Sequence, residues 1–331
     1  VLVLRKFRLP LFWVRSRGCR SMLDAAVVVD VAGISFADGR GFAIVIYNAL
    51  MTGVPLMLGV PTVKAAQALG PFQSVPNKWL APLVLRRVKT VCARGARTRE
   101  HLDSLGGVNS IDVADLAFSL DEAASFPDAV ATALGSIDKN FIVVMPSAVV
   151  RGIFESSDGN YVSAMAALVA DIRHKTGCSV VIAPHSYRAG LPEGRMNDGP
   201  VCREVAEACS GDSQVLGLDF DLTAGELRHL VAHSSVLVTS RFHAMISGLA
   251  TSTPTVVVGW SHKYKEVLDD FGLSSVGLDS SALNDPSAIA DTVKKVLASK
   301  DDISRQISAA LPAVKIRSLR NFSAIAEAVT R

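Results

Sequence analysis

The feature that most constrains this chain is a series of short, continuous apolar runs, each followed by Gly, Pro or Ser and then by a segment of helical period. Apolar runs without alternation are typical of strands that are covered on both faces. Their alternation with helices predicts parallel sheets joined by right-handed crossovers. The predicted strands lie within residues 25–33, 55–60, 90–95, 141–147, 178–186, 214–219, 235–241 and 255–260.

The chain is long enough for two domains. Its 331 residues, 49% hydrophobic and 20% charged, supply apolar material for two cores. An acidic, Ala/Ser-rich stretch at 119–140 shows no strand pattern and separates two groups of predicted strands. We therefore predict an α/β protein of two Rossmann-like domains facing a cleft, 1–130 and 131–331. The amphipathic segment 314–331 is expected to cross back to the first domain.

Charge and cysteine usage exclude several classes of protein. A net charge of +3 gives no basis for nucleic-acid binding. The five cysteines are scattered and suit thiols in a reducing compartment, so we expect a cytoplasmic protein. No stretch has the roughly 18 consecutive apolar residues of a membrane span. The seven histidines form no H-E-x-x-H motif, and we expect no metal.

The first twenty residues are basic, with no acid before Asp24 and with aromatic residues among the cations. One interpretation is peripheral contact with anionic lipid, or with a lipid-linked substrate, at the inner face of the membrane. The other is a solvated basic helix. The sequence leaves both open.

The strongest chemical signal is Arg241 and His243, which follow the predicted strand at 235–241. Ser240 is predicted to cap the next helix, whose free N–H groups and positive end attract anions. The planar arginine fork suits a carboxylate or a phosphate. Because a buried, unpaired arginine is costly, either an anionic ligand or an internal Asp or Glu should meet Arg241.

Other strand ends carry further candidates. His185, with Asp198 in the loop after it, fits either a site or structural hydrogen bonding. Lys263 fits either a second anionic group or a solvated position at a helix start. The Gly-rich stretch after the first predicted strand indicates either a ligand loop or a structural turn. Its candidate ligands are Asp30, Gly33 and Asp38.

Taken in order, these stretches resemble the polysaccharide pyruvyl transferase family. The S-R-x-H-A block at 240–244 is the most specific. The resemblance implies a glycosyltransferase B-like architecture, with the acceptor on the first domain and the donor on the second. The family's opening strand and Gly-rich loop have no counterpart here, so the first domain is expected to lack them. The supporting stretches are 27–41, 64–74, 91–107, 112–120, 180–186 and 236–273.

The resemblance also implies an activity: transfer of the pyruvyl unit of phosphoenolpyruvate to a sugar of a cell-surface polysaccharide or its lipid-linked precursor, without a cofactor. The product would be a cyclic pyruvate ketal. Arg241, the helix end at Ser240 and Lys263 would hold the donor, and His243 would protonate its methylene carbon. His185 or Asp198 would accept protons from the sugar hydroxyls.

Two alternatives remain. A sugar-nucleotide glycosyltransferase of the same architecture would want a ribose-binding carboxylate, for which Glu266 is the candidate. A non-catalytic relative would bind a glycan or serve as a scaffold, and would tolerate loss of Arg241 and His243.

Overall fold

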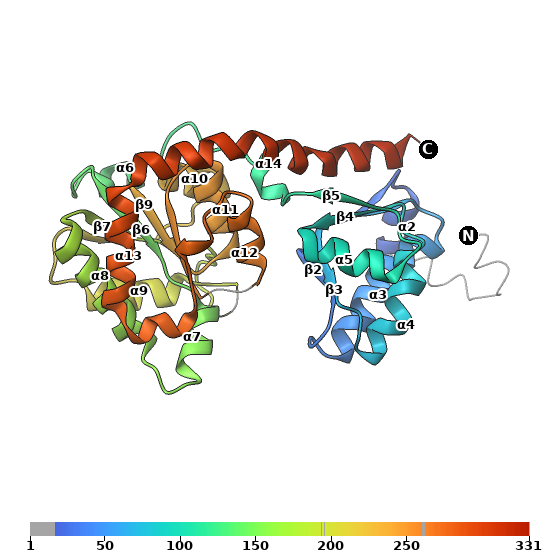
Figure 1. Ribbon diagram of the computed structural model, residues 1–331, viewed down its shortest axis with the longest axis horizontal. Coiled ribbons are helices and arrows are strands. Elements are labelled where there is room, and N and C mark those ends of the chain that lie inside the picture. The colour runs from blue at the N-terminus through green and yellow to red at the C-terminus, as the bar shows by residue number, and fades with distance from the viewer. Residues whose placement is uncertain (1–16, 193, 195, 260–261, 331) are drawn as a thin grey trace. The chain divides into compact units, whose positions relative to one another are not determined.

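The computed structural model describes residues 17–192, 194, 196–259 and 262–330 (Figure 1). The chain divides into two compact units. Among the described residues, the first unit comprises 17–119 and 313–330, and the second comprises 120–312. Most of the basic segment at the start of the chain lies outside the described residues, so both interpretations of it stay predictions.

The first unit is a parallel sheet in the order β1-β3-β4-β5, with β2 pairing with β3 off this path. Its apolar runs supply the strands, and the glycines at 39 and 41, both at positive φ, turn the chain into α3. The elements are α2 (Arg17–Leu23), β1 (Val28–Asp30), β2 (Ile34–Ala37), α3 (Phe42–Met57), β3 (Thr62–Gly70), α4 (Val75–Leu85), β4 (Thr90–Arg94), α5 (Ala96–Leu105), β5 (Ser110–Val113) and η2 (Leu116–Ser119).

The last helix of the chain, α14 (Lys300–Val329), completes the first unit with its C-terminal part. Ala324 and Ala328 pack against Val63 and other buried residues of the sheet. Strand β3 has an irregular register between Lys64 and Gln67. Such an irregularity leaves backbone groups that need another partner. The predicted final helix is present, and its C-terminal part belongs to the core of the first unit.

The second unit is a six-stranded parallel sheet in the order β11-β10-β9-β6-β7-β8. Its elements are α6 (Asp128–Leu134), β6 (Phe141–Met145), α7 (Ala148–Glu155), α8 (Tyr161–Thr176), β7 (Ser179–Ile182), α9 (Gly199–Ala208), β8 (Val215–Gly217), α10 (Ala224–Ala232), β9 (Val236–Thr239), α11 (Phe242–Ala250), β10 (Thr255–Val258), α12 (His262–Asp269), η3 (Ser274–Val276), β11 (Gly277–Leu278), η4 (Ser280–Asn284) and α13 (Pro286–Ala298).

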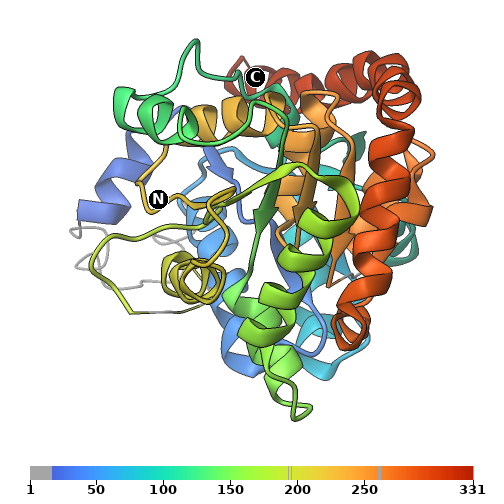
Figure 2. The same cartoon turned by 90° about the vertical axis from the view of Figure 1, so that its left-hand side faces the viewer.

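Helices cover both faces of this sheet, as the continuous apolar strands require (Figure 2). Helices α8, α9 and α13 pack together, and α10 packs with α11. Strand β6 lies at the centre: the chain proceeds from it to β7 and β8 on one side, then returns to β9, β10 and β11 on the other. The strand order therefore reverses between β6 and β9, which is where ligands bind in open α/β sheets.

Most of the predicted strands are confirmed, but the one at 55–60 is wrong. Helix α3 runs to Met57 with Pro55 inside it, and the strand follows at Thr62–Gly70. A short apolar run fits a buried strand and a buried helix equally well, and periodicity could not separate them here. The short strands β2, β5 and β11 were not predicted.

The units divide at Ser119/Leu120, before the predicted boundary at 130/131. Residues after 120 belong to the second unit because the backbone there bonds to it. The carbonyl of Leu120 accepts from Arg228, and the N–H of Ala123 donates to Gly225 O at 3.0 Å. The side chain of Val130 is buried in that unit's core.

We expect Asn321→Leu to lower the free energy of unfolding by about 2–4 kcal/mol, as measured by urea titration of the full chain. The buried amide of Asn321 accepts from the N–H of Ala66 at 2.8 Å and donates to Ala114 O at 3.1 Å, so leucine would strand both groups. Asn48→Leu is the control, since the Asn48 amide nitrogen is buried without a partner among the described residues. An equal cost for both variants would contradict this role of Asn321.

Candidate functional site

The candidate site lies at the carboxyl ends of β6, β7 and β9, beside the reversal of strand order. The chain leaves β6 through Ser147 into α7, leaves β7 through His185, and leaves β9 through Ser240 and Arg241 into α11. Asp198 lies at the end of the loop after β7, directly before α9. The parallel strands therefore bring together residues that lie far apart in the sequence.

The centre of this site is an ion pair between Arg241 and Asp198. The guanidinium donates from Nε to Asp198 Oδ2 at 2.7 Å and from Nη2 to Oδ1. Asp198 is 0% exposed, whereas the Arg241 side chain is 16% exposed. The carboxylate also accepts from the N–H of Ala148 at 2.9 Å and from that of Ser186 at 3.2 Å. Asp198 thus ties the ends of three strands together.

This pair fulfils one of the two predictions for the partner of Arg241, the internal carboxylate, and leaves its role toward an anionic ligand a prediction. An internal carboxylate meets the arginine, so its charge is compensated without a ligand. It also corrects the role expected of Asp198 as a substrate ligand or proton acceptor, because the carboxylate is fully buried and accepts four hydrogen bonds. A side-on bidentate pair uses one edge of a guanidinium and leaves the Nη1 edge for another anion.

Ser240 does not cap α11, contrary to the prediction. The N-cap residue is Arg241, which makes no side-chain capping bond, and its N–H donates to Thr239 Oγ1 at 3.0 Å. Ser240 is buried, and its carbonyl accepts from Tyr264 Oη at 3.1 Å. Its role in the structure is to join the end of β9 to α12. The first N–H groups of α11 still form the positive end of that helix.

His185 is held in its neutral form. Burial, together with the positive charges of His243 and Arg241, lowers the pKa of His185 from 6.5 to about 3. The same interactions show that the two histidines and the arginine lie close together. At neutral pH, His185 can therefore donate or accept a hydrogen bond, but it is a weak base.

Phe242 brings the remaining predicted groups together. Its buried ring contacts the ring of His243 edge-on, with centroids 5.4 Å apart. The Lys263 ammonium lies 5.0 Å from the Phe242 ring centre, within range of a cation–π contact. His243 is exposed. Arg241, His243 and Lys263 are thus gathered at the start of α11.

In the first unit, Asp30 bonds to protein groups rather than facing solvent as a ligand. Its carboxylate pairs with the fully buried Lys64 ammonium at 2.5 Å and accepts from the N–H of Ala32 at 2.9 Å. Burial alone would raise the pKa of Asp30, but the charge and hydrogen bond of Lys64 lower it. Lys64 also donates to Thr52 at 3.0 Å. Asp30 therefore forms a structural ion pair, and its ligand role stays a prediction.

Asp38 and Gly33 also have structural explanations. Asp38 accepts hydrogen bonds from Asn77, from the backbone of Gln73, and from the backbone and hydroxyl of Ser74, which orders the start of α4. Burial would raise the pKa of Asp38, but these bonds lower it. The carbonyl of Gly33 accepts from Arg94 at 3.1 Å. These residues support the turn reading of the Gly-rich stretch.

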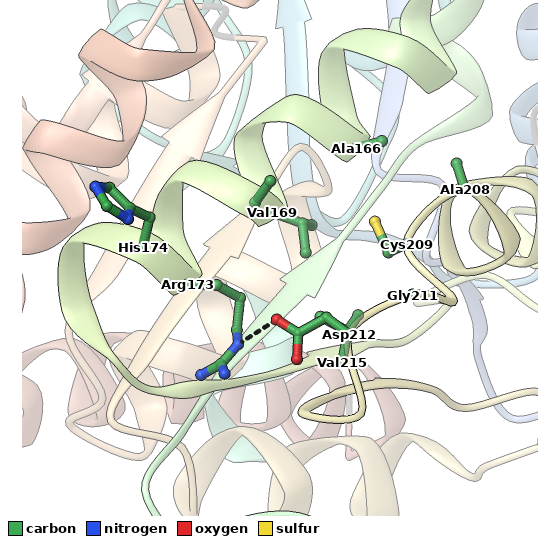
Figure 3. Close-up of a pocket in the computed structure, with 10 residues that line it drawn as sticks. Ala166, Val169, Arg173, His174, Ala208, Cys209, Gly211, Asp212 and Val215 are labelled. Carbon is green, nitrogen blue, oxygen red and sulfur yellow. Dashed lines mark hydrogen bonds and ion pairs between the residues drawn. The ribbon is translucent and has the colours of Figure 1, made fainter.

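A surface pocket of about 480 Å³ lies elsewhere in the second unit (Figure 3). It is bordered by α8, the end of α9 and the start of β8, so it lies at the amino edge of the sheet. Arg173 and Asp212 face each other there at 2.8 Å, and Arg173 also donates to the Cys178 carbonyl at 2.6 Å. These charges hold the loop before β7, and none of the predicted site residues borders the pocket.

Two negative findings concern the described residues only. In that part of the chain, no three His, Cys, Asp or Glu side chains gather as metal ligands would. No helix in it is long and apolar enough to cross a membrane.

Three solved structures are similar to this chain in fold. MnaA of S. aureus, solved with UDP, is 12% identical with a TM-score of 0.58, covering 91% of this chain and 76% of its own. A Listeria monocytogenes protein assigned as a UDP-N-acetylglucosamine 2-epimerase is 11% identical with a TM-score of 0.62, covering 96% and 80%. A UDP-forming trehalose-phosphate synthase of Burkholderia vietnamiensis is 11% identical with a TM-score of 0.55, covering 95% and 77%.

These likenesses define the class: an α/β protein with two Rossmann-like parallel sheets of the glycosyltransferase B type, as predicted. No curated protein matches the sequence. The sequence model of the polysaccharide pyruvyl transferase family matches residues 3–262, and the chain belongs to that family.

Several residues of the site were not identified from the sequence. Phe242 lies between the two named residues of the S-R-x-H-A block but carries no polar group. Tyr161 is fully buried and accepts from the N–H of Ser147 at 3.0 Å, and its burial raises the pKa of the phenol. The Ser147 hydroxyl is buried without a partner among the described residues. Tyr161 lies at the start of α8 and Ser147 follows β6, and nothing in the sequence indicated that the two residues would be in contact.

We expect Arg241→Ala to lower the free energy of unfolding by about 3–5 kcal/mol, because it strands a fully buried carboxylate. Urea unfolding of the full chain measures this. Arg203→Ala is the matched control: its pair with Asp219, at 2.9 Å, is half exposed and should contribute about 0–1 kcal/mol. The double change Arg241→Met/Asp198→Asn should recover part of the loss, because the amide oxygen of Asn can still accept from a backbone N–H that Asp198 holds. A cost for Arg241→Ala no greater than for Arg203→Ala would refute the structural role of the pair.

The lowered pKa of His185 predicts a pH dependence of stability. Folding disfavours the protonated ring of His185. The contribution of the neutral ring to the free energy of unfolding is therefore complete above pH 6.5, and it decreases as the pH falls toward about 3. The slope of unfolding free energy against pH should therefore flatten between pH 6.5 and 4 in His185→Gln. The exposed His174→Gln is the control and should retain the slope. An unchanged slope in His185→Gln would count against a neutral His185.

Proposed function

We propose that this protein transfers the pyruvyl group of phosphoenolpyruvate to a sugar of a cell-surface polysaccharide or its precursor, forming a pyruvate ketal. The observation that carries the proposal is the gathering of Arg241, His243 and Lys263 around Phe242 at the start of α11. Membership of the pyruvyl transferase family supports it.

The donor has two anionic groups, and the site has matching cations. The outward edge of Arg241 suits a carboxylate or phosphate because Asp198 already fixes its inner edge. The start of α11 adds N–H donors, and Lys263 adds a second cation beside it. A guanidinium held in place by a buried carboxylate loses little conformational freedom when the anion binds.

Ketal formation needs one proton delivered and two removed. In the proposed reaction His243 gives a proton to the methylene carbon, which becomes a methyl group, and C2 becomes electrophilic. Two sugar hydroxyls form bonds to C2, and the bond from C2 to the phosphate oxygen breaks. Of the two hydroxyl protons, one restores His243 and the other leaves with the phosphate.

The electrostatics separate the two histidines into different tasks. A bound dianion raises the pKa of nearby imidazoles, which favours the protonated form of the exposed His243. His185 starts from a pKa of about 3 and stays neutral. We assign His185 a hydrogen bond to the donor or acceptor rather than the removal of a proton, and Asp198 the positioning of Arg241.

A sugar nucleotide is the competing donor, because MnaA of S. aureus shares the fold and was solved with UDP. Its candidate ribose ligand, Glu266, lies within α12. Calorimetric titration with phosphoenolpyruvate and with UDP-sugars distinguishes the two. Binding of a UDP-sugar with no heat from phosphoenolpyruvate would overturn the proposal.

The direct test incubates the protein with phosphoenolpyruvate and a panel of galactosides, glucosides and mannosides while phosphate release is followed. We expect release that depends on one acceptor. His243→Gln should lower kcat by about 100-fold or more. Lys263→Met should raise KM for phosphoenolpyruvate by about tenfold.

Lys265→Met is the matched control on the same helix, because Lys265 pairs with Asp269 at 2.7 Å on the exposed side of α12. It should change neither kcat nor KM. A His243→Gln protein with unchanged kcat, or equal effects of the two lysine variants, would contradict the proposed roles.

A further inference from the structure

Helix α3 differs from an ordinary surface helix because apolar residues lie on its outward side as well as on its buried side. It has no charged residue over its 16 residues, and its buried stripe carries Asn48 and Thr52. Residues three and four apart share a helix face, so the opposite stripe is apolar and points outward. Its exposed members are Ile44, Tyr47, Leu50 and Met51.

Helix α4 repeats this arrangement. Asn77 is fully buried, and it donates to Asp38 at 2.6 Å. The outward stripe, at spacings of four, is Val75, Trp79 and Leu83, with Trp79 71% exposed. The two helices pack against each other in the first unit, α3 and α4 in Figure 1. Their outward stripes form what we call the α3–α4 face.

The stretch of sequence that contains these two helices carries charge of one sign. Between Asp38 and Glu100 the sequence contains no acidic residue. The Asp38 carboxylate accepts hydrogen bonds from the backbone and the hydroxyl of Ser74 at the start of α4. On the helical wheel, Lys78 borders the α4 stripe, whereas Arg86, just after α4, donates to the carbonyls of Leu105 and Gly106. The exposed cations of this stretch are Arg40, Lys78, Arg86, Arg87, Lys89 and Arg97.

We propose that the α3–α4 face docks the protein on the surface of a bilayer containing anionic lipids. Outward aliphatic side chains can enter the acyl boundary, and Trp79 and Tyr47 have the amphipathic rings that favour the interface. Bordering cations attract anionic headgroups. This docking does not depend on the reaction catalysed in the second unit.

The geometry fits a helix lying on the membrane rather than crossing it. The 16 residues of α3 span about 24 Å, less than the roughly 30 Å of a hydrocarbon core. Its inner stripe is anchored to the sheet, since Thr52 accepts from the buried Lys64 at 3.0 Å. Only the outer stripe is therefore available to lipid.

The first experiment measures sedimentation of the full chain with vesicles of phosphatidylglycerol and phosphatidylcholine, and with phosphatidylcholine alone. We expect binding to the anionic vesicles. Trp79→Glu/Leu83→Glu should weaken it by about tenfold or more. Lys78→Gln should weaken it about fivefold. The control Ile153→Glu changes an exposed apolar residue of α7 and should bind like the unmodified chain.

The second experiment needs no disruptive substitution at the face. The chain has three tryptophans, so Trp13→Phe/Trp260→Phe leaves Trp79 as the sole reporter. Its emission should shift to the blue on anionic vesicles and be quenched by brominated lipid. An unshifted Trp79 in a chain that sediments with vesicles would overturn the proposal.

Two other outcomes would also overturn it. Binding that survives Trp79→Glu/Leu83→Glu but is lost on removing residues 1–16 would assign the membrane contact to that segment. A dimer seen by sedimentation without lipid, dissociated by Trp79→Glu and accompanied by no vesicle binding, would assign the face to a second copy of the chain.

Discussion

The buried pair of Asp198 and Arg241 is the interaction on which the second unit's site depends. Asp198 receives the arginine and two backbone N–H groups, so one carboxylate joins the segments that follow β6, β7 and β9. A charge buried this deeply is tolerated only when it is fully paired. The guanidinium is thereby fixed before a ligand arrives, which is the preorganisation that anion binding and catalysis exploit.

In the first unit charged groups are likewise paired, and polar residues lie on the buried side of one helix. Asp30 and Asp38 are held by hydrogen bonds to buried or capping groups, and Asn48 and Thr52 line the inner stripe of α3. Asp30 and Asp38 therefore have structural roles, and their roles as ligands stay predictions. The surface that remains is apolar and bordered by cations, and its chemistry differs from that of the site after β9.

Much of the architecture was predictable because it rests on local patterns. Covered parallel strands need β-branched apolar runs, and these occur at β6, β7, β9 and β10. The pattern failed at 55–60, where the apolar end of a helix has the composition of a strand. It failed again at Ser240, because the backbone of α11 begins one residue later than the capping rule placed it.

The sequence by itself determined the α/β class, the two sheets and the S-R-x-H-A block, because each depends on residues that are consecutive in the chain. The partner of Arg241 was decided only by the folded structure. Asp198 lies 43 positions earlier, and no local rule distinguishes it from the other carboxylates of the chain. Strand order brings the two together, and burial then makes their pairing obligatory.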